Sequence, residues 1–228
     1  KGTLLSQHFI SPDLRKDLHE TQIKTVKLTA EVWRKRLFDI SWFMRALNEY
    51  IARAANKEDD CTGHFWEGRF KSQALLDESA LAACMAYVDL NPVRAKMAKT
   101  PETSNHTSIK YRINAASVGK TPKRLMPFAD TPKKEMPQGL PFTLPDYLQL
   151  VDMTSRYIHP NKRGKVERSL PTILERLNIE HEHWLTLTTQ FETCFKQAAG
   201  KVIHLEQYAH NQHQQRVQGR QSEMLLLG

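Results

Sequence analysis

Tyr87 and Asn91 have the types and spacing that suit nucleophilic chemistry. They lie four residues apart, so both side chains point to the same spot if a helix continues through them. A tyrosine hydroxyl has an ordinary pKa of about 10, so as a nucleophile it needs a cation that favours the phenolate and polarises the phosphate it attacks. An amide oxygen is a reasonable ligand for a hard, magnesium-like ion. The alternative is that Tyr87 is a half-buried core aromatic and Asn91 a helix C-cap.

A basic and aromatic segment, GHFWEGRFK, occupies residues 63–71. Composition predicts a strand over 70–76. Arg69 and Lys71 alternate with Phe70 at its start, so both cations face one side and can hold phosphates. Trp66 or Phe65 can then stack on an unpaired base. The alternative is a solvated strand face with Phe70 buried beneath it.

Two further residues are candidates for contact with nucleic acid. His64 borders the basic segment. Arg94 follows Pro92 and can either hold a phosphate or cap the carbonyls of the preceding helix. Lys110 and Arg112 continue the basic trend.

Three segments occur in a familiar order: SWFMRALNE at 41–49, GHFWEGRFK at 63–71 and YVDLNPVR at 87–94. Their order and spacing resemble the REP-associated branch of the single-tyrosine transposases, which belong to the HUH endonuclease class. The similarity covers about residues 38–112. It implies an α+β chain, predominantly helical, in which an incomplete HUH/ferredoxin-like transposase core is followed by a helical domain.

The resemblance also implies an activity and its site. In that family a helical tyrosine attacks a phosphodiester of single-stranded or hairpin DNA, which leaves a 5′-phosphotyrosine and a free 3′-hydroxyl. Tyr87 matches the nucleophile, and Asn91 matches the metal ligand four positions later. The implied cofactor is Mg²⁺ or Mn²⁺ and the implied partner is DNA, while a homodimer stays open.

The family's principal metal ligands are two histidines that flank a hydrophobic residue on a strand, and no such pair precedes His64. His181 and His183 have this spacing, but in a helical context they point about 200 degrees apart, so they are rejected as the metal site. Because the chain begins with Lys1, we expect that an upstream part is missing. The alternative function is a catalytically inactive or truncated DNA-binding protein that recognises hairpin repeats.

The elements that must position these residues are mostly helices. Periodicity predicts helices from a Thr29 N-cap to Phe38, over 39–56 with a core stripe of Ile40, Met44, Leu47 and Ile51, and from an Asp77 N-cap to about Leu90. On the last of these, we expect Leu81, Met85 and Val88 to face the core, and Ala80 and Ala83 to leave Tyr87 accessible. Further helices are predicted over 146–157, 171–177, 180–199 and, more weakly, up to about 215.

Domain organisation follows from composition. The prediction is a transposase-like domain over 1–114, a proline-rich basic linker over 115–145 and a helical C-terminal domain over 146–228.

Bulk properties are compatible with a partner that is a polyanion. The 228 residues carry a formal charge of +8, have a pI near 9.4 and are 40% hydrophobic. The three cysteines have no metal-ligand or disulfide spacing, and no apolar run is long enough to span a membrane, so we expect a cytoplasmic protein.

Overall fold

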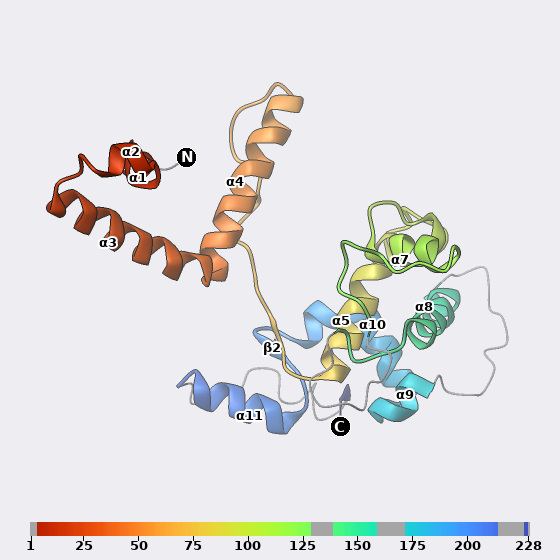
Figure 1. Ribbon diagram of the computed structural model, residues 1–228. Coiled ribbons are helices and arrows are strands. Elements are labelled where there is room, and N and C mark those ends of the chain that lie inside the picture. The colour runs from red at the N-terminus through yellow and green to blue at the C-terminus, as the bar shows by residue number, and fades with distance from the viewer. Residues whose placement is uncertain (1–3, 129–138, 159–171, 214–225, 228) are drawn as a thin grey trace. The chain divides into compact units, whose positions relative to one another are not determined.

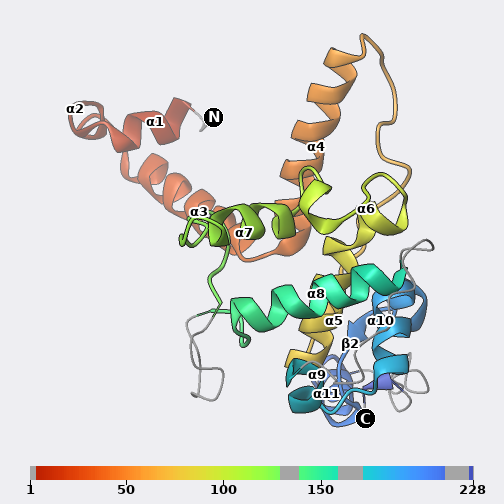
Figure 2. The same ribbon diagram turned by 90° about the vertical axis from the view of Figure 1, so that its right-hand side faces the viewer.

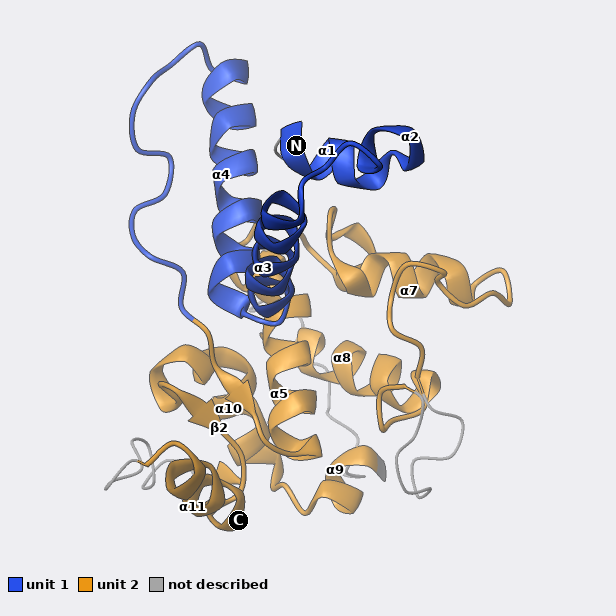
Figure 3. Ribbon diagram, turned by 60° about the vertical axis from the view of Figure 1, so that its left-hand side comes forward, with its two compact units in different colours: residues 1–71 blue, residues 72–228 orange. Residues whose placement is uncertain are grey.

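The computed structural model describes residues 4–128, 139–158, 172–213 and 226–227, and these residues are mostly helical. Figure 1 shows the order of the elements, and Figure 3 shows the two compact units, unit 1 over residues 1–71 and unit 2 over residues 72–228. The chain is therefore α-rich, as expected, but it divides at a place different from the predicted domain boundaries. No helix in the described part of the chain combines the length and the apolar character needed to cross a membrane.

Unit 1 consists of helices followed by an irregular segment over 59–71. The helices are α1 (Leu4–Ile10), α2 (Pro12–Arg15), α3 (Glu20–Leu37) and α4 (Ile40–Glu58). The expected N-cap at Thr29 is wrong, because Thr29 lies inside α3 and its hydroxyl donates to the Thr25 carbonyl at 2.8 Å. α3 instead begins with a capping box, in which the His19 ring accepts from the backbone of the first turn and Gln22 accepts from the His19 N–H.

The described part of unit 1 buries little apolar surface. Val26 is its one buried side chain there. The predicted core stripe on α4 does not form a core: Ile40 is 58% exposed and Leu47 is 40% exposed. A 3.6-residue periodicity marks an apolar face but does not supply what covers it.

Unit 2 contains the remaining elements. Its helices are α5 (Glu78–Asp89), α6 (Asn91–Arg94), η1 (Pro101–Thr103), α7 (Ser108–Ala116), α8 (Leu144–Ile158), α9 (Thr172–Leu177), α10 (His181–Cys194) and α11 (Val202–Asn211). Its strands are β1 (Ala74–Leu75) and β2 (Ala198–Ala199). Asp77 is confirmed as the N-cap of α5, because its carboxylate accepts from the Ala80 N–H at 2.9 Å.

The core of unit 2 joins segments that the sequence assigned to different predicted domains. Phe142 of the predicted linker and Trp184 of α10 are buried in the same cluster as the alanines of α5. A second cluster brings Leu90 and Ile109 against Tyr147 of α8. Figures 1 and 2 both show α5 beside α10. Residues 129–138 of the predicted linker lie outside the described residues.

The strands β1 and β2 pair in parallel, Ala74 with Ala198 and Leu75 with Ala199. The predicted strand over 70–76 is therefore wrong in extent: residues 70–73 form no ladder, because β2 offers only two partner residues. The HUH/ferredoxin-like core implied by the resemblance is not confirmed by the described residues. Gly200 directly follows β2 and lies close to the residue that follows β1. A Cβ at Gly200 would lie 2.9 Å from Leu76 Cβ.

Candidate active site

The alanines of α5 set the position of Tyr87. Ala80 and Ala83 are fully buried, whereas Val88 is 57% exposed. These alanines were expected to leave Tyr87 accessible, but small side chains also allow a neighbouring helix to approach closely, and α10 packs there. Tyr87 is consequently half-buried at the edge of the α5–α10 contact.

Two groups contact the Tyr87 ring. The Phe191 ring of α10 lies 5.9 Å from it between centroids, with the planes tilted by 36°. The Arg94 guanidinium carbon lies 3.7 Å from the Tyr87 ring centroid, which is a close cation–π contact. Within the described part of the chain, the Tyr87 hydroxyl has no hydrogen-bond partner and is not among the buried unpartnered atoms. The ring is thus fixed while its oxygen stays free to accept or donate.

Arg94 also links Tyr87 to Asn91. α5 ends at Asp89, and Pro92 starts the short helix α6, whose last residue is Arg94. Arg94 Nη2 donates to Asn91 Oδ1 at 3.0 Å. Arg94 therefore contacts both the Tyr87 ring and the Asn91 amide, although the helix expected to continue from Tyr87 through Asn91 ends at Asp89.

The anchor of Arg94 comes from α10. Arg94 Nη1 donates to the Thr188 carbonyl at 2.6 Å, and α10 is kinked at Gln190, where the backbone is non-helical. Arg94 therefore does not cap the carbonyls of α5, which was the alternative interpretation. Two of its five N–H groups are used in these two bonds, so the guanidinium retains donors for an anion.

The residues described around Asn91 do not fit Mg²⁺ or Mn²⁺. Asn91 Oδ1 already accepts from Arg94, and a guanidinium at that position repels a dication. Across the described ranges there is no group of three or more His, Cys, Asp or Glu residues that could hold a metal. His181 lies at the start of α10, where its ring packs edge-on against Tyr157, in line with the helical context expected for it.

A buried carboxylate fixes the end of the tyrosine helix. Asp89, two residues after Tyr87, is 2% exposed and accepts from Tyr147 Oη at 2.7 Å and from the Ile109 N–H at 3.1 Å. Ser108 Oγ is its third donor. Burial, and secondly the Asp89 carboxylate, raise the pKa of Tyr147 well above its usual value, so its hydroxyl stays protonated as a donor.

Arg112 does not serve as a nucleic-acid contact, contrary to its place in the basic trend. Its side chain is buried, with the guanidinium carbon 4.6 Å from the Phe128 ring centroid and one donated bond to the Met126 carbonyl. Its Nε has no hydrogen-bond partner among the described residues. Burial lowers the pKa of Arg112, while nearby Asp89 acts in the opposite direction.

The basic segment 63–71 belongs to unit 1 and forms no strand. Arg69 and Lys71 are exposed, so their expected alignment on one strand face is wrong, although both cations are free to reach solvent. The Trp66 indole donates to the Asn48 carbonyl of α4 at 3.0 Å and packs edge-on against Phe65. His64 is exposed as well.

Sequence reasoning missed Thr188 and Phe191. Neither carries a motif: one contributes a backbone carbonyl, and the other reads as an ordinary core aromatic of an amphipathic helix. Only the packing of α10 on α5 brings them to Tyr87.

Comparisons of the chain with protein-family models, with curated proteins and with solved structures found no match.

Proposed function

We propose that this chain belongs to a transposase of the single-tyrosine HUH type, which binds single-stranded or hairpin DNA and cleaves and rejoins it in DNA transposition. The phenolic oxygen of Tyr87 attacks a phosphorus of the DNA backbone, and the bond from that phosphorus to the 3′ oxygen breaks. The 5′ phosphate stays on the tyrosine, the phenol proton passes to solvent, and the 3′ oxygen takes up a proton as a free hydroxyl. The proposal includes an incomplete HUH/ferredoxin-like core and a cytoplasmic location.

The observation that carries the proposal is the convergence of three residues. Arg94 contacts both of the other residues: its guanidinium carbon lies 3.7 Å from the Tyr87 ring centroid, and its Nη2 donates to Asn91 Oδ1. The Tyr87 hydroxyl has no partner among the described residues. A guanidinium held beside the phenol can bind a phosphate of the DNA backbone. Ordinary core packing explains the contact with Phe191, but it gives no reason for an arginine and an amide at the same spot.

The exposed cations Arg69 and Lys71, with His64 and Trp66, are proposed DNA contacts of unit 1. Mg²⁺ or Mn²⁺ enters the proposal as the ion that the resemblance implies, and when bound it would polarise the phosphate. The described residues do not supply its ligand set, so no step is assigned to it. The chain's own contribution is the nucleophile and the guanidinium that holds the phosphate.

A covalent-capture assay tests the proposal. A single-stranded oligonucleotide labelled at its 3′ end is incubated with the protein and Mg²⁺ or Mn²⁺, because the protein retains the fragment that follows the cut. We expect a labelled, denaturant-resistant adduct that Tyr87→Phe abolishes. Tyr157→Phe is the matched control, since this tyrosine of unit 2 is 56% exposed and has no part in the cluster, and it should leave the adduct unchanged. An adduct that persists in Tyr87→Phe contradicts the assignment.

The second candidate function is a DNA-binding protein without catalysis. It is favoured by the mutual pairing of Arg94 and Asn91, which satisfies the amide without a metal. It predicts that DNA binding weakens as the salt concentration is raised, because phosphate contacts release counterions. It also predicts that no covalent adduct forms with either Mg²⁺ or Mn²⁺. The Tyr87→Phe variant would then bind DNA as the wild type does, and neither protein would form an adduct.

A further inference from the structure

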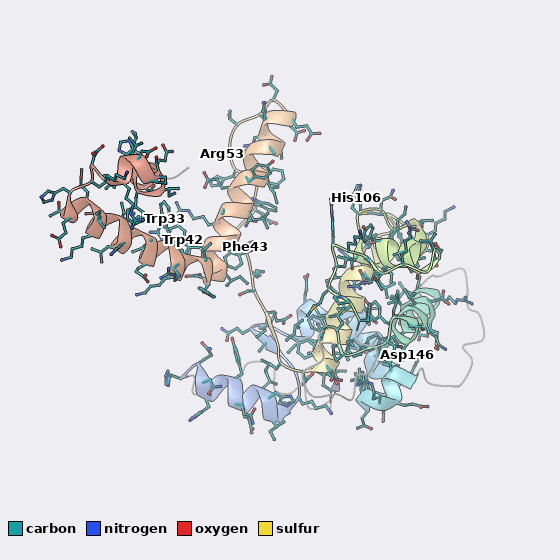
Figure 4. The ribbon with its side chains drawn as sticks, viewed as in Figure 1. Trp33, Trp42, Phe43, Arg53, His106 and Asp146 are labelled. Atoms are coloured by element: carbon teal, nitrogen blue, oxygen red, sulfur yellow. The ribbon has the colours of Figure 1, made fainter. Side chains whose placement is uncertain are left out.

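The junction between α3 and α4 in unit 1 gathers exposed aromatic and basic side chains. We call it the elbow surface, and it consists of Trp33, Arg36, Phe38, Trp42, Phe43 and Arg45. Phe38 is 88% exposed, Phe43 is 62% exposed and Trp33 is 40% exposed. Figure 4 shows Trp33, Trp42 and Phe43 around this junction, with Arg53 toward the other end of α4. So much exposed aromatic surface in one place indicates a binding site.

The elbow surface is held by two helix caps that follow one another directly. Phe38 is the C-cap of α3, and its N–H bonds to the carbonyls of the last turn. Asp39 is the N-cap of α4, and its carboxylate accepts from the Ser41 N–H at 2.7 Å. Because no loop separates the two helices, the aromatic residues on either side of the junction lie close together along the chain.

One indole lies against cations from both helices. The Arg36 guanidinium carbon, from the last turn of α3, is 3.9 Å from the Trp42 ring centroid. The Arg45 guanidinium carbon, one turn further along α4, is 5.1 Å from the same ring. This places two phosphate-binding groups beside a ring that can stack on a base.

The charges of the elbow surface are not neutralised. Elsewhere on these helices arginines are paired, Arg34 with Glu31 and Arg53 with Glu49. In the described part of the chain, neither Arg36 nor Arg45 has a carboxylate partner. The acid nearest to Arg36 in sequence, Asp39, accepts a bond of its helix cap, and the acid nearest to Arg45, Glu49, is paired with Arg53. A surface that keeps unpaired cations beside exposed rings is complementary to an aromatic polyanion.

We propose that the elbow surface binds single-stranded DNA, with bases stacked on its aromatic rings and phosphates held by Arg36 and Arg45. A second copy of this chain fits less well, because a symmetric contact would set the same unpaired arginines against each other. An apolar protein partner would leave both arginines buried without a counter-charge. The choice of DNA over RNA rests on the proposed function, whereas the stacking and charge argument does not depend on Tyr87.

Fluorescence anisotropy of a labelled single-stranded oligonucleotide tests this site. Trp42→Ala should weaken binding about 5-fold to 150-fold, the range that corresponds to one base stacked on an aromatic ring, and Trp42→Phe should restore most of it. Replacement of both Arg36 and Arg45 by Gln should lower the slope of log affinity against log salt by about 0.7 for each phosphate that the variant no longer binds. Arg53→Gln is the matched control, because this exposed arginine of α4 is already paired with Glu49, and it should leave the affinity within about 2-fold.

Three outcomes overturn the inference. If both Trp42→Ala and the double arginine variant bind the oligonucleotide with wild-type affinity, the elbow surface does not bind DNA. If these variants change the molar mass measured by light scattering but not the DNA affinity, the elbow surface is a protein interface. If an RNA of the same sequence binds more tightly than the DNA, and this binding depends on the elbow surface, the ligand is RNA. Failure of the proposed reaction looks different: the adduct is absent while elbow-dependent binding persists. Should Trp42→Ala not fold, the double arginine variant decides, since both of its side chains lie on the surface.

Discussion

The hydroxyl of Tyr147 should contribute measurably to the stability of unit 2. Tyr147 is fully buried, and its Oη donates to Asp89 Oδ2 at 2.7 Å. Tyr147→Phe keeps the ring and its packing but removes this donor. A hydrogen bond to a charged group contributes roughly 1.5–3 kcal/mol, and Asp89 keeps its other two donors, so we expect the free energy of unfolding to fall by about 2 kcal/mol. For a unit of this size, the melting temperature should drop by roughly 4–8 °C.

Urea unfolding followed by circular dichroism measures the change, with wild type and variant compared at pH 7. Tyr157→Phe on the same helix is the control, because that tyrosine is exposed and its hydroxyl has no described partner; its effect should stay within about 0.5 kcal/mol. The double variant Tyr147→Phe, Ser108→Ala should show non-additive loss, since both hydroxyls serve one carboxylate. If Tyr147→Phe unfolds at the same urea concentration as wild type, the Asp89 network does not hold the end of α5.

Other groups of unit 2 give three more predictions. Because the folded-state pKa of Tyr147 is raised above the ordinary value of 10.0, the unfolded chain loses this proton first; the unfolding free energy should therefore fall by about 1.4 kcal/mol per pH unit above about pH 10, and urea titrations of Tyr147→Phe should lack that component. Burial raises the pKa of Cys84 and of Cys194, whereas Cys61 of unit 1 is exposed, so iodoacetamide followed by peptide mass spectrometry should modify Cys61 first, and equal rates at Cys61 and Cys84 would contradict the burial. Gly200→Ala should cost about 2 kcal/mol in urea unfolding, because its Cβ would lie 2.9 Å from Leu76 Cβ at a φ of +158°, while Gly68→Ala, with open space around it, should be nearly neutral.

Helices whose ends carry local signals could be predicted from the sequence. The Asp77 cap and the proline at 92 bound α5 at nearly the predicted residues, and the start of α4 at Asp39 was placed within one residue. The cap at Thr29 was wrong because α3 begins ten residues earlier with a histidine, which is not one of the residues that usually mark an N-cap. The strand over 70–76 was wrong in extent because strand composition does not reveal how long a partner is.

The candidate site was predictable only in part. The spacing of Tyr87 and Asn91 would place both side chains on one face of a continuous helix, but α5 ends at Asp89, between them. The placement of Arg94 over the ring depends on a carbonyl of α10 that lies 94 residues away in sequence, and no local pattern encodes such a contact. The burial of Ala80, Ala83 and Arg112 likewise depends on tertiary packing, which a single helix does not specify.

The pairing of β1 with β2 and the anchor of Arg94 both impose an order on biosynthesis. Asp77 accepts from the Lys201 N–H, 124 positions later, and Thr188 reaches Arg94 only after α10 exists. At ribosomal rates of about 5–20 residues per second, Arg94 is synthesised roughly 5–19 seconds before Thr188. During that interval the alanine face of α5 has no partner helix, and the Arg94 guanidinium has no Thr188 carbonyl to hold it over the Tyr87 ring. The packing of Arg94 and Phe191 against Tyr87 therefore forms only after α10 has been synthesised.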